Sequence, residues 1–365
     1  MLKKFAVKNY RGFKEKIQLD LSSPGNYEYN QFAIKDGVIK DVLIYGPNGS
    51  GKSNIGFALF DIVYHLSQNN KQPNAFDNYS YANNGLPVEF DYEFVFDGID
   101  CLYHYSKSDK GALLSELLQV GKVTYFNRNS EQLFINQDLF QVQGRAVEDL
   151  FAQVNSVSVL AYLVGSYPLA VDSILLKIYH FVDKMLWFKC LDETRYIGFE
   201  SGNTYIEDYI IRNGLVEDYE SFLLAASNQE FHFKTPEPGD KRLFCVIDGN
   251  VMPFFDIAST GTHALQLLYY WASKMQTASL VFVDEFDAFY HYELSTEICD
   301  RLFAKDAQII LTSHNTSLMT NNLLRPDCYF LINGTRIKSI VNCTQKELRV
   351  GHNLEKLYRG KAFHV

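Results

Sequence analysis

The alternation of apolar and polar side chains divides the chain into two strand-rich regions with a helical region between them. Residues 88–96 alternate apolar and polar positions, and residues 99–106 and 122–126 add further strand patterns bounded by Gly, Asp and Lys turns. From about residue 241 onward, strand patterns alternate with helical patterns, as a parallel sheet flanked by helices requires. The pattern therefore predicts an α/β fold with a sheet-rich N-terminal lobe and a parallel-sheet core.

Residues 146–235 follow a different pattern. Apolar side chains recur at helical spacing in residues 170–191, and residues 203–227 read as a helix interrupted by Gly214. A long coiled coil would need apolar heptads sustained over many turns, and this region has none. We therefore expect a compact helical insert in place of a coiled-coil arm. The predicted parts of the chain are an N-terminal half (1–145), the insert (146–235) and a C-terminal half (236–365).

A complete phosphate-binding loop follows the apolar run of residues 41–45. Its residues are Gly46, Pro47, Asn48, Gly49, Ser50, Gly51, Lys52 and Ser53. The glycines let successive backbone N–H groups point at a phosphate chain, Lys52 reaches the β- and γ-phosphates, and the Ser53 hydroxyl can ligate Mg²⁺. We assign the next residue, Asn54, to the same site. The sequence therefore predicts ATP and Mg²⁺ as ligands.

Two later apolar strands end in residues that complete such a site. Residues 280–283 lead into Asp284 and Glu285, the Walker B arrangement, in which Asp284 holds Mg²⁺ through water and Glu285 polarises the attacking water. Residues 308–313 lead into His314, which can hydrogen-bond the γ-phosphate. A histidine after a strand is usually structural, but this distance from Walker B favours a functional role. We predict Glu285, His314 and Lys52 as the catalytic residues.

A further phosphate-binding element precedes Walker B. Ser259 and Gly261 stand before a helical pattern at residues 264–275, where a hydroxyl, backbone N–H groups and the positive end of the helix dipole suit a phosphate. Ser-Thr-Gly before a helix is also an ordinary cap. The position between Walker A and Walker B favours the phosphate-binding role.

Composition narrows the class of protein. The net charge of −9 excludes a surface that binds nucleic acid throughout, and six scattered cysteines without a CxxC pair indicate reduced thiols. No apolar run is long enough to span a bilayer, so we expect a soluble, cytoplasmic protein without membrane contact. A basic cluster near the start fits either a solvated strand edge or a nucleic-acid strip; it comprises Lys3, Lys4, Lys8, Arg11, Lys14 and Lys16.

The order of these motifs resembles that of the ABC/SMC-type ATPases, and more narrowly the prokaryotic "AAA-fifteen" group of phage-defence and abortive-infection loci. The shared motifs are the P-loop, residues 259–262, residues 283–287 and residues 312–315. Residues 5–13, 114–117, 125–128 and 353–363 match the group's first strand, central sheet and tail. The resemblance implies the head fold of an ABC-type P-loop ATPase and Mg-dependent ATP hydrolysis.

In this family two subunits enclose two ATP molecules head-to-tail. The resemblance therefore implies a homodimer or higher oligomer in which Ser259 and Gly261 act on the ATP of the opposite subunit. The P-loop and the strand-end residues would act within their own subunit. By resemblance Arg11 contacts the γ-phosphate, although a surface arginine needs no such role.

The chain departs from the family pattern at three places. Ala258 and Thr260 replace the leading Leu and second Gly of transporter signatures, and residues 287–291 differ from the usual pair after Walker B. Gln68 and Gln72 are the candidates for the Q-loop glutamine. These departures indicate slow or partner-dependent turnover.

The resemblance implies an anti-phage switch that senses a phage component and controls a separate effector, as in the ATPase subunits of PARIS, Septu and some retron-linked systems. The chain shows no nuclease constellation, and His232, His263 and His352 are solitary, so a nuclease or toxin partner would dock on the insert. The alternative is an SMC- or RecF-like DNA-binding repair ATPase, with the early lysines and Arg11 lining a groove. The net negative charge and the lack of a coiled-coil pattern disfavour this DNA-binding alternative. The departures at Ala258 and Thr260 disfavour a third alternative, the ATPase subunit of a transporter.

Overall fold

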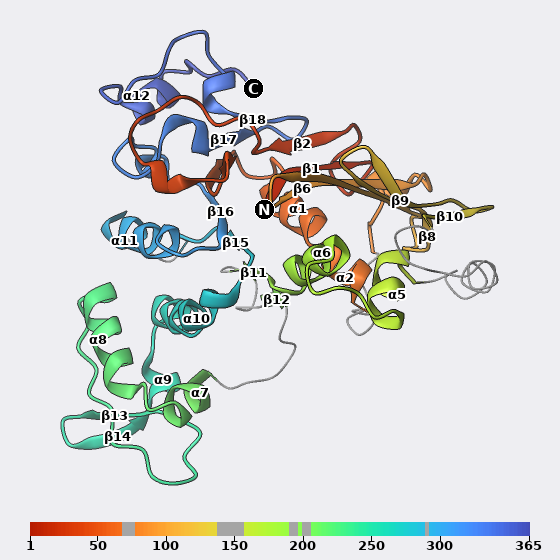
Figure 1. Ribbon diagram of the computed structural model, residues 1–365. Helices are drawn as coiled ribbons and strands as arrows, with labels where there is room; N and C mark the ends of the chain where they lie inside the picture. Colours follow the sequence, from red (N-terminus) through yellow and green to blue (C-terminus); the bar gives the residue numbers. More distant parts are fainter. Residues whose placement is uncertain (68–76, 137–156, 190–195, 199–205, 289–291) are drawn as a thin grey trace.

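The computed structural model describes residues 1–67, 77–136, 157–189, 196–198, 206–288 and 292–365 (Figure 1). One of its two large sheets is antiparallel and forms the N-terminal lobe. The strand order is β10 (Leu133–Ile135), β9 (Val123–Arg128), β8 (Leu113–Val120), β7 (Ile99–Lys107), β6 (Val88–Phe96), β1 (Leu2–Lys8) and β2 (Ile17–Asp20). Burial alternates along β6, because one face of an antiparallel sheet packs on the core while the other meets water.

The second large sheet is the core. Its order is β12 (Tyr196–Gly198), β11 (Met185–Lys189), β15 (Leu280–Asp284), β16 (Gln308–Ser313), β5 (Asp41–Tyr45), β17 (Tyr329–Ile332) and β18 (Ile337–Ser339). The five strands from β11 to β17 run parallel, and every residue of β15, β16 and β5 is buried. Continuous apolar runs of this kind are typical of strands covered on both faces.

Helices lie beside both sheets (Figure 1). They are α1 (Lys52–Leu59), α2 (Asp61–Leu66), α5 (Val159–Ser166), α6 (Ile174–Asp183), α7 (Ile206–Arg212), α8 (Val216–Ser227), α9 (Phe254–Ile257), α10 (Thr260–Lys274), α11 (Tyr292–Phe303) and α12 (Leu354–Arg359). Two small hairpins complete the fold: β3 (Ile34–Lys35) with β4 (Val38–Ile39), and β13 (Phe244–Ile247) with β14 (Asn250–Pro253). The predicted α/β head, with a sheet-rich lobe and a parallel core, is confirmed.

The helical region agrees with the sequence in one half and differs in the other. Gly214, at φ +65°, separates α7 from α8 as predicted. The helix expected over residues 170–191 is wrong beyond Asp183, because residues 185–189 form β11, which pairs with β15. Residues 185–188 form a short, continuously apolar run, a pattern that periodicity cannot assign to helix or strand.

Residues 146–235 therefore contribute a core strand as well as helices, and the three-part division of the chain stays a prediction. No helix in the described residues exceeds the 15 residues of α10, so the part of the chain that the structure describes contains no coiled-coil arm. Among these residues, no helix has the length and apolar character that crossing a membrane requires. Gln68 and Gln72 lie outside the described residues.

Candidate nucleotide-binding site

The predicted site residues follow three adjacent parallel strands. β16 lies between β5 and β15, with Ser313 opposite Tyr45 and Leu311 opposite Val283. Because parallel strands end at the same edge of a sheet, the P-loop after β5, His314 after β16 and Glu285 after β15 lie side by side. This edge is where α/β proteins bind ligands.

The P-loop backbone requires its glycines. Gly51 has φ +99° and caps α1, and a Cβ there would lie 2.7 Å from the ring of Phe13. A Cβ on Gly46 would lie 2.6 Å from the carbonyl oxygen of Ile332. Positive φ and the absence of space both exclude larger residues. The hydroxyl of Ser50, enclosed within this loop, is buried without a hydrogen-bond partner, which suits a ligand oxygen at that point.

Lys52 is folded onto its own loop. Its Nζ donates to the carbonyl oxygens of Gly46 (2.9 Å) and Pro47 (3.3 Å). Burial lowers the pKa of Lys52, and the nearby carboxylates of Glu285 and Asp284 oppose that shift. A cation held by two neutral carbonyls is poised for an anionic ligand, whose charge would compensate its desolvation.

Thr312 of β16 is hydrogen-bonded to both Walker B residues. Its hydroxyl donates to Asp284 Oδ1 (2.7 Å) and accepts from the backbone N–H of Glu285 (2.7 Å). Glu285 has φ +49°, a left-handed conformation that is uncommon outside glycine and is found at functional sites. The Glu285 carboxylate lies 3.2 Å from Nε2 of His314. The three strand-end residues therefore meet within one chain.

Asp287 adds a second link between the same strands. Its Oδ2 accepts a hydrogen bond from the Ser313 hydroxyl (2.6 Å), and the same hydroxyl accepts from the N–H of Asn315. Burial raises the pKa of Asp287. Sequence reasoning assigned no role to Thr312 or Asp287. The available signal was the pair of hydroxyl residues that ends an otherwise apolar strand.

The donor set suits Mg²⁺. Ser53, in the first turn of α1, supplies a hydroxyl and Asp284 supplies a carboxylate, and both are the hard oxygen ligands that Mg²⁺ prefers. In the described residues no three His, Cys, Asp or Glu side chains form a metal cluster.

Arg11 is brought to α1. Its guanidinium lies 4.0 Å from the ring centroid of Phe57, and its backbone has φ +46°. The Nε atom is buried without a hydrogen-bond partner. Asn54 borders the same loop, since a Cβ on Gly12 would lie 3.1 Å from its amide nitrogen. The loop that carries Arg11 therefore packs along the helix that starts at the P-loop.

The predicted signature, residues 259–262, lies away from the P-loop and the strand-end residues described above. Ser259 caps α10 through a hydrogen bond from the N–H of Thr262 (3.1 Å), and Ser259 and Thr260 are exposed. α10 packs against α7 and α8, on the far side of the core from α1 in Figure 1. Among the described residues no hydrogen bond joins Ser259 or Gly261 to the P-loop. One chain therefore does not bring the signature to its own nucleotide loop.

Most of the basic cluster near the start of the chain is neutralised. Four of its lysines pair with acidic residues of β6 or of the β7 strand; the pairs are Lys3 with Asp100, Lys4 with Glu93, Lys8 with Glu89 and Lys16 with Asp91. All four lie along a sheet edge or face where opposite charges are neighbours. These ion pairs favour a neutralised part of the sheet over a nucleic-acid strip, although β1 lies between β6 and β2 and is not an edge strand.

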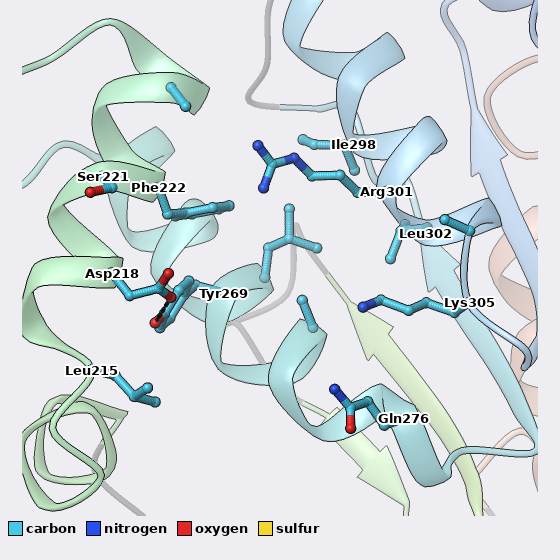
Figure 2. A pocket seen from close by; sticks show the side chains of 14 residues that line it. Leu215, Asp218, Ser221, Phe222, Tyr269, Gln276, Ile298, Arg301, Leu302 and Lys305 are labelled. Atoms are coloured by element: carbon cyan, nitrogen blue, oxygen red, sulfur yellow. Dashed lines mark hydrogen bonds between the residues drawn. The ribbon is translucent and has the colours of Figure 1, made fainter.

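A cavity of about 620 Å³ lies between α8, α10 and α11 (Figure 2). Leu268, Ile298 and Leu302 contribute apolar lining, and Arg301 and Lys305 extend into it from α11 and the residues that follow it. Asp218 accepts a hydrogen bond from the Tyr269 hydroxyl on the opposite wall. The cavity does not include the P-loop or the strand ends, so it is separate from the candidate nucleotide site.

Residues 198–320 match a protein-family model described as "AAA domain, putative AbiEii toxin, Type IV TA system". The match covers about a third of the chain. It includes the signature, Walker B and His314, and it does not include the P-loop. No curated protein sequence matches the chain.

Solved structures similar to the chain include three SMC heads. The SMC head domain from Thermotoga maritima is 15% identical with a TM-score of 0.44, over 93% of this chain and 98% of that one. An SMC head bound to the C-winged helix domain of ScpA is 13% identical with a TM-score of 0.47, over 93% and 97%. An SMC head with a coiled coil and joint derived from Pyrococcus yayanosii is 12% identical with a TM-score of 0.47, over 99% of each chain.

Proposed function

We propose that the protein is a switch that binds and hydrolyses ATP and dimerises around it. The observation that carries this proposal is the meeting of the P-loop, Glu285 and His314 at one sheet edge, while Ser259 is exposed elsewhere. The P-loop, Glu285 and His314 are suited to holding and cleaving a triphosphate. Ser259, at the start of α10, is suited to capping a triphosphate that another chain holds.

Each residue of the edge has a chemical task in this proposal. Lys52 exchanges its loop carbonyls for phosphate oxygens, and the P-loop N–H groups bind the remaining phosphate charge. Ser53 and Asp284 would hold Mg²⁺, which when bound neutralises charge on the phosphates. Glu285 orients and polarises the attacking water, and His314, 3.2 Å away, senses the γ-phosphate.

We infer a dimer because the P-loop and the signature are separated within one chain. A γ-phosphate bound in one copy offers charge to the N–H groups and hydroxyl at the α10 N-terminus of a second copy. Hydrolysis removes that charge, so the two copies separate. Arg11, packed along α1, is the residue we assign to the γ-phosphate from within the chain.

For the biological setting we propose defence, with a separate effector under the control of the switch. The description of the matching family model, which names a toxin and a toxin–antitoxin system, supports this setting. The paired lysines weigh against the DNA-binding alternative, because cations already neutralised by β6 and β7 contribute little to phosphate binding. Salt-dependent retention on duplex DNA in the ATP state would instead favour the repair ATPase.

The test is Glu285→Gln with ATP and Mg²⁺. The amide keeps the shape of the side chain but cannot polarise water, so hydrolysis should fall by about a hundredfold or more. Light scattering should then report a stable dimer that the parent protein forms only transiently. A matched control is Glu297→Gln, an exposed carboxylate on α11, which should hydrolyse ATP like the parent. A monomer at saturating ATP in the Glu285→Gln variant would contradict the proposal.

A further inference from the structure

The hairpin next to the signature exposes an unusual amount of apolar surface. Val246, Ile247, Val251 and Met252 of the hairpin and Phe255 of α9 are all between 40% and 62% exposed. In the hairpin register Val246 lies opposite Val251, and Ile247 and Met252 point to the other face, so apolar side chains are exposed on both faces. We name these five residues together the β13–β14 patch. Apolar groups gathered in this way mark interaction surfaces in proteins that are otherwise well packed.

The outer edge of the hairpin is also open. In the part of the chain that the structure describes, β14 pairs only with β13. Figure 1 shows the hairpin at the periphery of the molecule, beside α9. Natural proteins cover or charge such edges, because an exposed apolar strand invites association. Covering by another chain is one way to meet this requirement.

The position of the patch identifies which chain covers it. Phe255 precedes Ser259 by four residues, which span at most about 14 Å even when extended. If Ser259 caps the ATP of a second copy, Phe255 must face that copy as well. We infer that the β13–β14 patch packs against the second copy beside its P-loop, an inference that rests on the proposed ATP-dependent dimer.

The surface beside the P-loop is complementary to the patch. The ring of Phe13 lies against Gly51, and in the same loop Asn9 donates to the carbonyl oxygen of Leu86 (3.0 Å). Leu86 is therefore tied to the loop that reaches the P-loop through Phe13, and its side chain is 59% exposed. It offers an exposed apolar contact for the patch.

Charge complements the apolar contact. Lys14 follows this loop and is exposed, and Asp256 lies next to Phe255 and is exposed. Neither forms an ion pair with another described residue, so each is available to an opposite charge on a second copy. In the inferred dimer Lys14 of one copy faces Asp256 of the other, which steers the two surfaces into register.

The experiment measures dimerisation of Glu285→Gln with ATP and Mg²⁺ by analytical ultracentrifugation, with and without patch substitutions. Val251→Ser with Met252→Ser and Phe255→Ser should raise the dimer dissociation constant by about tenfold or more, since apolar anchors dominate such interfaces. ATP affinity of the monomer should not change. The matched control is Val171→Ser, which alters a side chain 94% exposed elsewhere and should leave the dissociation constant unchanged.

Mixing variants tests the direct contact. Leu86→Ser should also weaken the dimer, and a mixture of the Leu86→Ser protein with the patch variant should dimerise more tightly than either alone. The mixed dimer has one interface with both changes and one interface intact, whereas each homodimer has none intact. A mixture no tighter than the homodimers overturns the pairing of the patch with Leu86.

The outcomes separate the two proposals. If Glu285→Gln dimerises and the patch variant dimerises equally well, the patch faces something else and only this inference fails. If Glu285→Gln itself stays monomeric with saturating ATP, the proposed switch fails and the inference fails with it. Circular dichroism verifies that the serine variants fold, as expected for substitutions of exposed side chains.

Discussion

Two regions of the molecule differ in how far their polar groups are already satisfied: the sheet edge that carries the P-loop, Glu285 and His314 (the nucleotide edge), and the surface around the first turn of α10 (the signature face). At the edge, buried strands hold polar side chains that are already joined, such as Thr312 with Asp284 and His314 with Glu285. At the signature face, the cap of α10 is exposed and its neighbour Phe255 is 62% exposed. The residues at the edge are therefore preorganised within one chain, whereas the first turn of α10 is left exposed, as the proposed role in capping the ATP of a second copy requires.

The largest expected effect is on ATP affinity, and it distinguishes the nucleotide edge from the signature face. Lys52→Ala removes the cation that the P-loop holds, and ATP affinity should fall by about a hundredfold or more, because a buried charge-assisted contact is lost. Ser259→Ala should leave the affinity of the monomer unchanged while it weakens the ATP-dependent dimer. Isothermal titration calorimetry measures the first effect and light scattering the second. Equal losses of monomer affinity in both variants would show that the regions are not independent.

A smaller effect tests how far the edge is preorganised. Thr312→Val keeps the shape of the side chain but removes the hydrogen bonds to Asp284 and to the N–H of Glu285. The turnover number should fall by about tenfold, and the free energy of unfolding by about 1–3 kcal/mol, because buried polar groups lose their partner. Steady-state kinetics and urea denaturation measure these effects. Thr296→Val, on the exposed side of α11, is the control and should change neither quantity.

A further effect, on stability alone, comes from the opposite end of β5. Burial raises the pKa of Asp41 to about 8, despite the ammonium of Lys40 at 3.2 Å. Between the ordinary pKa of 3.8 and this value, the folded protein keeps a proton that the unfolded chain releases. Stability should therefore fall as pH rises from about 4 to 8, with a slope of at most about 1.4 kcal/mol per pH unit.

Asp41→Asn removes this titration and should flatten the curve of unfolding free energy against pH. Nucleotide affinity should be unaffected, because Asp41 begins the strand whose other end carries the P-loop. Urea denaturation at several pH values measures the slope. An unchanged slope in the variant would assign the pH dependence to other groups.

The sequence predicts most of the edge because its motifs are local. Each motif is a short apolar run followed within two residues by its polar groups, so the strand and the chemistry are read together. The adjacency of Glu285 and His314 could be expected only from the parallel order of their strands. The roles of Thr312 and Asp287 could not, because they depend on hydrogen bonds between residues 26 to 28 positions apart.

The secondary-structure prediction was wrong where the local sequence pattern does not determine the tertiary environment. Residues 185–188 are apolar throughout, and only the pairing of residues 185–189 with β15 makes them a strand rather than the continuation of α6. The hairpin of β13 and β14 turns at Asp248 and Gly249, both of which adopt positive φ. Its exposure was not predictable, because a β-rich apolar run is ordinarily a buried one.

The hollow between α8, α10 and α11 has a mechanical consequence for the helix that begins at the signature. Leu268 and Ala272 of α10 border this space, so that side of the helix lacks the close packing that resists displacement elsewhere in the protein. A small tilt of α10 toward this space would meet less resistance than one toward a fully packed face, and it would carry the first turn of the helix with it. Bulkier residues filling the hollow would remove that freedom and make the signature rigid.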